Sequence, residues 1–326
     1  MNDIGVLLLL ALPASGKSEV RKYLGTFRAE TLRTEFNLHD PVQLDDYPYV
    51  EFMRAVDEVA DGLLHYGCVF FEAHDRPFLD PYEWLALVEL LNQDFLARGG
   101  EEWSEPRSAA MAMFQRIDEA ERCAQARRKL SRLPRDVLET MAAHLEDRAR
   151  KMFAVRRQTL QSWHDGQTLI IEFSRGFGLG MPDDPPRGYE AALRQLHPSI
   201  LAEASILYVS VDPAESRRKN AERAVPPPGC TDTGIYHGVP TSVMLGEYAR
   251  DDMSRLIEEG GHGDLIVIPA HGMHHHLPVA VLDNRRDLTT FVRGDPKDWP
   301  ADKALVLHTA LREALRPLPR RQGCSF

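Results

Sequence analysis

Short apolar runs alternate along this chain with longer segments whose apolar residues recur every three or four positions. The first run, Gly5–Leu10, is apolar throughout, which is typical of a strand buried on both faces of a parallel sheet. The runs that we predict as strands are Gly5–Leu10, Val42–Leu44, Cys68–Phe71, Thr168–Ile171, Ile206–Val211, Leu265–Ile268 and Val279–Leu282. The helical spacing predicts helices at Lys17–Phe27, Tyr49–Tyr66, Asp80–Arg98, Ile117–Leu130, Pro134–Trp163, Tyr189–Ala204 and Ala301–Leu315.

This alternation predicts an α/β protein with a mostly parallel sheet. Residues 101–166 contain no strand-like run, so we interpret them as a helical insertion. The insertion divides the predicted core into a first part, residues 1–100, and a second part, residues 167–326.

The strongest local signal follows the first predicted strand, where the chain reads Ala-Leu-Pro-Ala-Ser-Gly-Lys-Ser from Ala11 to Ser18. It matches the phosphate-binding loop, or Walker A motif, except that Ala11 stands at the first glycine position. Buried strand, glycine-containing turn and helix follow one another as this loop requires, because its amides and the helix N-terminus must converge on phosphate oxygens. We therefore expect a P-loop NTPase three-layer fold. The residues expected to hold the nucleotide are Pro13, Ala14, Ser15, Gly16, Lys17 and Ser18.

Acidic residues directly follow several predicted strands, where the ligands of open α/β sheets bind. Asp45 and Asp46 follow Val42–Leu44, and either could accept a proton from an attacking hydroxyl. Glu172 follows Thr168–Ile171 in the way a Walker B acid does, and we expect Glu172 and Ser18 to position Mg²⁺. Glu72 follows Cys68–Phe71 in the same way, so the pattern leaves two candidates for this acid.

Arginines form a second group of candidates. Arg175 lies just after Glu172, where it could face a transferred phosphoryl group. Arg217 and Arg223 follow the strand that ends at Val211, and arginines there could neutralise transition-state charge.

The order of these parts resembles the P-loop nucleoside and nucleotide kinase group, which includes adenylate kinase, dephospho-coenzyme A kinase and deoxynucleoside kinases. The resemblance covers about residues 4–50 and 168–316, and only the phosphate loop is a specific motif. It implies a lid-like segment at about 213–262 that contains Arg217 and Arg223. It also implies that Asn284 lies near the adenine and that Asp46 or Asp45 faces the phosphoryl acceptor.

These features favour an ATP- and Mg²⁺-dependent cytoplasmic kinase whose acceptor is nucleoside-like or another small molecule. One alternative is a kinase that acts on a nucleic-acid end or a modified base. Another is a P-loop ATPase switch or adaptor without a small acceptor. ATP or GTP preference, acceptor identity and oligomeric state are not specified by the pattern.

Charge distribution bears on the nucleic-acid alternative. The chain carries 39 basic and 49 acidic residues, a net charge of −10, which argues against a protein that coats nucleic acid indiscriminately. Arg127–Arg157 nevertheless contains ten basic and four acidic residues, so its balance is +6. A nucleic-acid strand could therefore bind the insertion.

Cysteine usage and hydropathy suggest the compartment. The four cysteines, Cys68, Cys123, Cys230 and Cys324, form no Cys-x-x-Cys pair, and we expect free thiols in a reducing cytoplasm. The longest apolar run holds about ten residues, whereas a membrane-spanning helix needs about 20, so no membrane association is expected.

Overall fold

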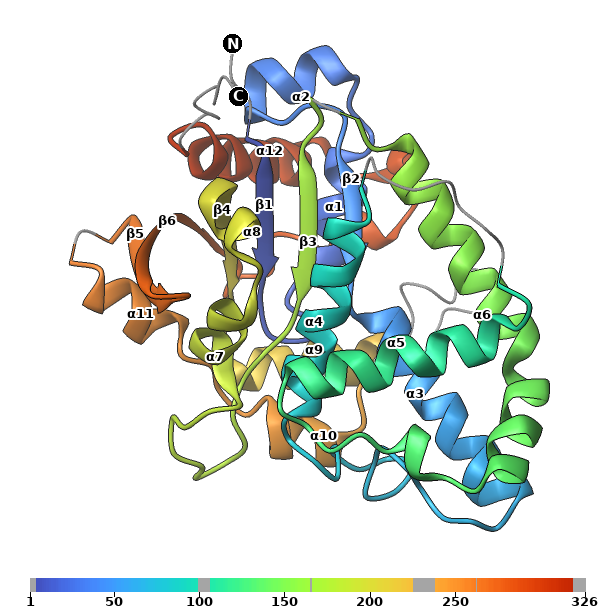
Figure 1. The fold of residues 1–326 in the computed structure, drawn as a ribbon. Helices are drawn as coiled ribbons and strands as arrows, with labels where there is room; N and C mark the ends of the chain where they lie inside the picture. Colours follow the sequence, from blue (N-terminus) through green and yellow to red (C-terminus); the bar gives the residue numbers. More distant parts are fainter. Residues whose placement is uncertain (1–3, 99–105, 165, 225–237, 262, 319–326) are drawn as a thin grey trace. The chain divides into compact units, whose positions relative to one another are not determined.

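A computed structural model describes residues 4–98, 106–164, 166–224, 238–261 and 263–318 of the chain (Figure 1). Two compact units divide it. Unit 1 contains residues 1–43, 166–182 and 198–326, and unit 2 contains residues 44–165 and 183–197. The predicted insertion at 101–166 thus falls almost wholly within unit 2, which also takes in the residues from Leu44 onward.

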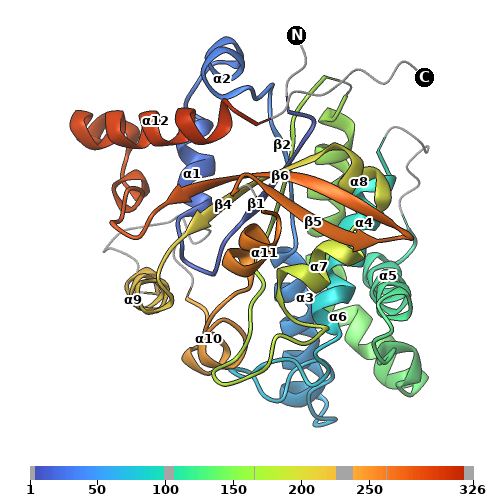
Figure 2. The same ribbon diagram turned by 90° about the vertical axis from the view of Figure 1, so that its left-hand side faces the viewer.

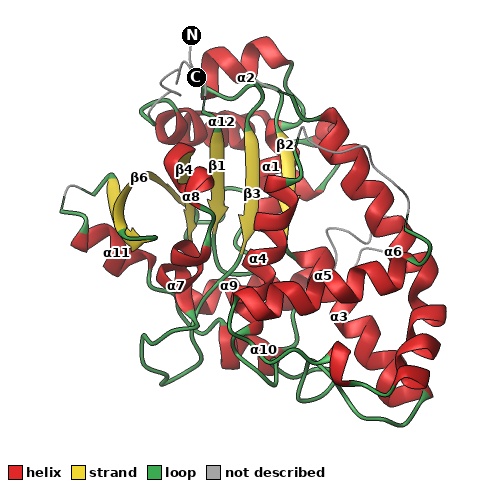
Figure 3. Cartoon of the chain, in the orientation of Figure 1, coloured by secondary structure: helices red, strands yellow, loops and turns green. Residues whose placement is uncertain are grey.

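Within the described residues, six strands form one mostly parallel sheet (Figure 3). Its order is β2-β3-β1-β4-β6-β5, and only the hairpin of β5 and β6 has an assigned antiparallel pairing. The strands are β1 (Val6–Leu10), β2 (Val42–Asp45), β3 (Leu169–Phe173), β4 (Ala204–Ser210), β5 (Leu265–Ala270) and β6 (Met273–Asp283). The α/β class and the mostly parallel sheet predicted from the sequence are confirmed.

Strand β1 occupies the centre of this sheet because all five of its residues are apolar and buried. It pairs in parallel with β3 on one side and β4 on the other. Leu9 lies opposite Glu172, and Leu10 lies opposite Tyr208. The register therefore brings the carboxyl ends of β1, β3 and β4 to the same edge, where the loop after β1 begins.

Three helices of unit 1 pack apolar side chains against this sheet. Leu7, Leu9, Leu207 and Val209 share a core with residues of α1, α2 and α12, and these three helices lie together on one side of the sheet (Figure 2). The helices of unit 1 are α1 (Lys17–Leu24), α2 (Ala29–Phe36), α8 (Pro198–Glu203), α9 (Pro213–Arg223), α10 (Thr241–Glu247), α11 (Met253–Glu259) and α12 (Ala301–Leu315), with short 3₁₀ turns at Thr290–Arg293 and Pro296–Asp298.

Apart from the last two residues of β2, the regular elements of unit 2 in its described residues are helices. Helix α6 has 28 residues and is about 42 Å long at 1.5 Å per residue. It packs against α5, which also packs against α4. The helices of unit 2 are α3 (Tyr47–Asp57), which continues as a π-helical turn at Glu58–Leu63, α4 (Glu83–Leu96), α5 (Ala109–Cys123), α6 (Arg135–Ser162) and α7 (Gly188–Gln195), with a 3₁₀ turn at Leu130–Arg132.

The predicted strand at Cys68–Phe71 is wrong. The side chain of Asp57 accepts hydrogen bonds from the backbone amides of Val69, Phe70 and Phe71, so a carboxylate takes the donors that a neighbouring strand would use. Phe71 forms only an isolated bridge with Phe78. The segment is therefore a loop held by α3, in which apolar side chains are buried without sheet pairing.

Two sequence expectations concern thiols and membranes. Cys68 and Cys123 are free thiols, while Cys230 and Cys324 lie outside the described residues. Among the described residues, no helix combines the length and the apolar composition that crossing a membrane requires.

Candidate functional site

The loop between β1 and α1 contains two residues with positive φ. Gly16 is the N-cap of α1 with φ of 108°, and Ala14 has φ of 56°, so both adopt left-handed conformations. Residues 11–17 are all buried. The left-handed residues turn the chain sharply, and the first amides of α1 are left without intrahelical acceptors at the loop.

Lys17 extends back across this loop. Its Nζ donates to the carbonyl oxygens of Ala11 at 3.0 Å and Leu12 at 3.5 Å, and to Ser174 Oγ at 2.6 Å. Ser174 directly follows β3, so the ammonium group connects the loop with the carboxyl end of the neighbouring strand.

Ala11, which stands where the motif usually has glycine, is completely buried. It belongs to the apolar core together with Leu9 and Val20. The methyl group is therefore accommodated by packing, and the loop retains its left-handed turn with alanine at this position.

Two further elements support the loop. Ser216 Oγ on α9 donates to the carbonyl oxygen of Pro13 at 2.7 Å. Asn284 Nδ2, just after β6, donates to the carbonyl oxygen of Ser15 at 2.7 Å and to Thr289 Oγ1 at 2.9 Å. The loop backbone is thus fixed from two directions by buried side chains.

The contacts of Asn284 differ from the role that the kinase resemblance implies. The side chain is completely buried, and its Oδ1 also accepts from the amide of Leu288 at 2.6 Å. Both ends of the amide group are therefore engaged within the protein. Asn284 therefore supports the loop, and a place near the adenine stays a prediction for this residue.

Glu172 lies on β3 beside the central strand and is paired with a residue of α1. Its Oε2 is 2.6 Å from Arg21 Nε, and Arg21 Nη1 also donates to Gln43. Ser18 and Arg21 are three residues apart on α1 and therefore share a face of the helix. Ser18 is partly exposed, and its hydroxyl forms no hydrogen bond within the described ranges.

Glu72 is the other candidate for the Walker B acid. The strand that it was expected to follow does not form in the described residues. Its side chain is exposed in a loop of unit 2, where its amide donates to the carbonyl oxygen of Pro77. Of the two acids, Glu172 is the one that a sheet strand positions next to β1.

Arg175 follows Ser174 and is buried, with 2% of its surface exposed. Its Nη1 donates to the carbonyl oxygen of Ser174 at 2.6 Å, and its guanidinium lies 5.1 Å from the centre of the Phe173 ring. Lys17, Ser174 and Arg175 thus form a continuous polar segment at the end of β3.

The arginines of α9 occupy different faces of the helix. Arg223 is buried and Arg217 is half-buried, while Arg218, between them in sequence, is exposed. The cation that the sequence reasoning missed is Lys219, which is 1% exposed and lies 2.8 Å from Asp287. The predicted lid continues into residues 225–237, which lie outside the described ranges.

Asp45 and Asp46 belong to unit 2, so the geometry of the loop in unit 1 does not include them. Asp45 Oδ1 accepts from the amide of Tyr47 at 2.9 Å, and Asp46 is a buried residue at the start of α3. Asp45 thus ends β2 and binds the first amide of α3, while Asp46 precedes α3 without a side-chain cap hydrogen bond.

Tyr208, on the strand β4 next to β1, forms a hydrogen-bonded pair of titratable side chains with Asp251. Tyr208, opposite Leu10, donates from its hydroxyl to Asp251, with distances of 2.9 and 3.1 Å to the two oxygens. Burial raises the pKa of Asp251 to about 6. Burial, together with the charge of Asp251, raises the pKa of Tyr208.

Sequence reasoning did not find Ser174, Ser216, Thr289 or Arg21. Serine, threonine and arginine after strands are common, and only the assembled sheet shows that these residues converge on one loop. Comparisons with known proteins add no further assignment: the chain matches no family model and no curated protein sequence significantly.

Proposed function

We propose that unit 1 is a P-loop nucleoside-triphosphate-binding domain with the three-layer fold of that class, and that the protein is an ATP- and Mg²⁺-dependent phosphotransferase. The observation that carries this proposal is the placement of Lys17, at the first turn of α1 with its Nζ directed over the loop toward Ser174. Converging amides, a helix N-terminus and a lysine together make a phosphate-binding site.

Each loop residue has a role in this proposal. The amides of residues 13–18 would donate to phosphate oxygens, and Lys17 would exchange its carbonyl partners for the β- and γ-phosphates. The exchange keeps the ammonium group satisfied in both states, because carbonyl and phosphate oxygens are both acceptors.

Ser18 and Glu172 fit the chemistry of Mg²⁺, because they are oxygen donors associated with one face of α1. Magnesium in nucleotide sites keeps several waters and needs only one or two protein ligands besides the phosphates. Within the described residues, no group of three or more acidic, histidine or cysteine side chains could hold a metal ion. When bound, the ion would supply positive charge to the phosphate oxygens.

In the transfer step, Arg175, Arg217 and Arg223 would supply positive charge as negative charge shifts toward the leaving phosphate. The acceptor class that we favour is nucleoside-like or another small molecule.

The experiment is ATP turnover with Mg²⁺ against nucleosides, nucleotides, small alcohols and short oligonucleotides. We expect one acceptor class to raise turnover at least tenfold, Lys17→Ala to abolish it, and Lys303→Ala, which changes an exposed lysine on α12, to leave it unchanged. Phosphorylation of the oligonucleotide alone would instead support a nucleic-acid kinase. Turnover that no acceptor changes would support an ATPase switch and contradict the kinase proposal.

A further inference from the structure

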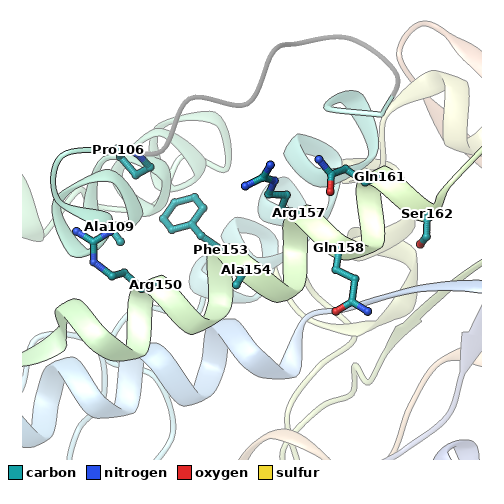
Figure 4. Close-up of a pocket in the computed structure, with 9 residues that line it drawn as sticks. All are labelled: Pro106, Ala109, Arg150, Phe153, Ala154, Arg157, Gln158, Gln161 and Ser162. Atoms are coloured by element: carbon teal, nitrogen blue, oxygen red, sulfur yellow. The ribbon is translucent and has the colours of Figure 1, made fainter.

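A pocket of about 480 Å³ runs along α6 in unit 2 (Figure 4). The polar side chains that line it come from one helix, while Pro106 and Ala109 contribute the opposite wall. Phe153 and Arg157 project from the same side of α6 (Figure 4). The lining side chains of α6 that bear on the argument are Arg150, Phe153, Arg157, Gln158, Gln161 and Ser162.

The described lining contains cations, amides and a hydroxyl, but no carboxylate. Arg157 is exposed and forms no ion pair among the described residues. Arg150 lies 2.7 Å from Glu146, whose carboxylate also accepts from the first amides of α5. Such a set of donors favours a ligand that carries negative charge and further acceptors.

Positive charge is also buried behind the pocket floor. The guanidinium of Arg116 lies 5.9 Å from the centre of the Phe153 ring. Asp94 accepts from Arg116 at 2.7 Å and also from Arg156, so one carboxylate serves two arginines. This cluster of two arginines and one aspartate carries a net charge of +1.

The spacing of the two lining arginines indicates an extended ligand. Arg150 and Arg157 are seven residues apart on α6, which places them about 10 Å apart along the helix axis. Successive phosphates follow one another within a few ångströms along a nucleic-acid strand, so two arginines at this distance can contact different phosphates. Gln158 and Gln161 offer both donors and acceptors, which suit the edges of unpaired bases.

We propose that this pocket binds single-stranded nucleic acid, with Arg150 and Arg157 on phosphates, the two glutamines on base edges and Phe153 as an apolar floor. An acidic peptide would pair with the arginines. Its carboxylates only accept hydrogen bonds, however, so they would not use the acceptors of the glutamines or the aromatic floor. The proposal concerns unit 2 alone and does not depend on the phosphate loop.

The test is binding of fluorescein-labelled oligothymidylate and oligouridylate of twelve nucleotides, followed by anisotropy between 50 and 200 mM salt without ATP. We expect Arg157→Gln to weaken binding five- to tenfold at 50 mM salt. The plot of log K against log salt should also become less steep, with its negative slope reduced in magnitude by about 0.7. This is the change expected when one phosphate contact on a single strand is lost.

Arg148→Gln is the matched control, because Arg148 is an exposed arginine of the same helix that does not line the pocket. It should leave both the affinity and the slope nearly unchanged, and Lys17→Ala should also bind the oligonucleotides normally. The proposal is overturned if the wild-type protein binds neither oligonucleotide, if Arg148→Gln weakens binding as much as Arg157→Gln, or if poly-glutamate of equal charge competes as well as unlabelled strand.

Discussion

Gly16 is the residue at which the phosphate loop is most constrained. Its φ of 108° is strained for any residue with a side chain, and a Cβ there would lie 2.5 Å from Thr289 Oγ1 and 2.7 Å from Asn284 Nδ2. Asn284 holds the loop through the carbonyl oxygen of Ser15, and Thr289 accepts a second hydrogen bond from the same amide group. A substitution at Gly16 therefore disturbs both the turn and its support.

Gly16→Ala should lower the free energy of unfolding by about 2 kcal/mol or more, from left-handed strain and the displacement of buried partners. It should also weaken nucleotide binding at least tenfold. Urea unfolding and calorimetric titration measure the two effects. Gly62→Ala is the control: a Cβ there meets nothing within 4 Å and φ is not left-handed, so equal losses in both variants would refute the constraint.

Asp251 gives the molecule a residue-specific pH dependence. Its pKa is about 6 in the folded protein, against an ordinary value of 3.8, because of burial beside Tyr208. The folded state therefore binds more protons than the unfolded state between these values, and stability falls as pH rises through them. The amide of asparagine can retain the hydrogen bond from Tyr208 but does not titrate.

The free energy of unfolding of the wild-type protein, minus that of Asp251→Asn, should consequently fall by up to about 3 kcal/mol between pH 4 and pH 7. Urea titrations of both proteins at four pH values provide the difference, in which the other titrating groups cancel. A difference that stays constant, or rises with pH, would show that Asp251 is not held protonated by its surroundings.

At the scale of elements, a buried charge cluster joins α4, α5 and the segment that follows α5. The side chains of Glu83 and Glu121 are completely buried, and both approach Lys129 Nζ, Glu121 at 3.4 Å. Burial lowers the pKa of Lys129 and raises the pKa of Glu121. Desolvation thus disfavours the charged forms of Lys129 and Glu121, and Lys129 is the cation that faces the two acids.

Lys129→Met should lower the free energy of unfolding by about 3–5 kcal/mol, because it leaves buried carboxylates without a cation. Chemical denaturation measures the loss, with Lys151→Met, an exposed lysine on α6, expected within about 0.5 kcal/mol of wild type. Adding Glu83→Gln to Lys129→Met should restore part of the loss. No recovery in the double variant would argue against an electrostatic origin.

The strands that were predicted correctly are those whose apolar runs find a neighbouring strand, as β1 does between β3 and β4. The run Cys68–Phe71 is also apolar throughout, but Asp57, eleven residues before it, accepts hydrogen bonds from its amides. An apolar run indicates that a segment is buried. Whether the segment forms a strand depends on which acceptors bind its backbone amides. That partner is a tertiary feature, so no local pattern could have distinguished the two cases.

For the whole molecule, the candidate site was predictable to different degrees in its different parts. The loop from Ala11 to Ser18 is a local motif, and its turn and helix could be predicted from consecutive residues. Ser174, Ser216 and Thr289 come from segments more than 150 residues away, and they contribute only because β3, α9 and the segment after β6 converge on the loop. Their contribution therefore required the sheet order.

The central claim is that the loop of unit 1 binds the triphosphate of ATP, and calorimetric titration of the intact protein with ATP and Mg²⁺ tests it most directly. We predict saturable binding that weakens at least tenfold without Mg²⁺ and at least a hundredfold in Lys17→Ala. Lys303→Ala should bind as the wild-type protein does. Absence of ATP binding, or binding that Lys17→Ala leaves intact, would contradict the assignment of the phosphate loop and the phosphotransferase proposal built on it.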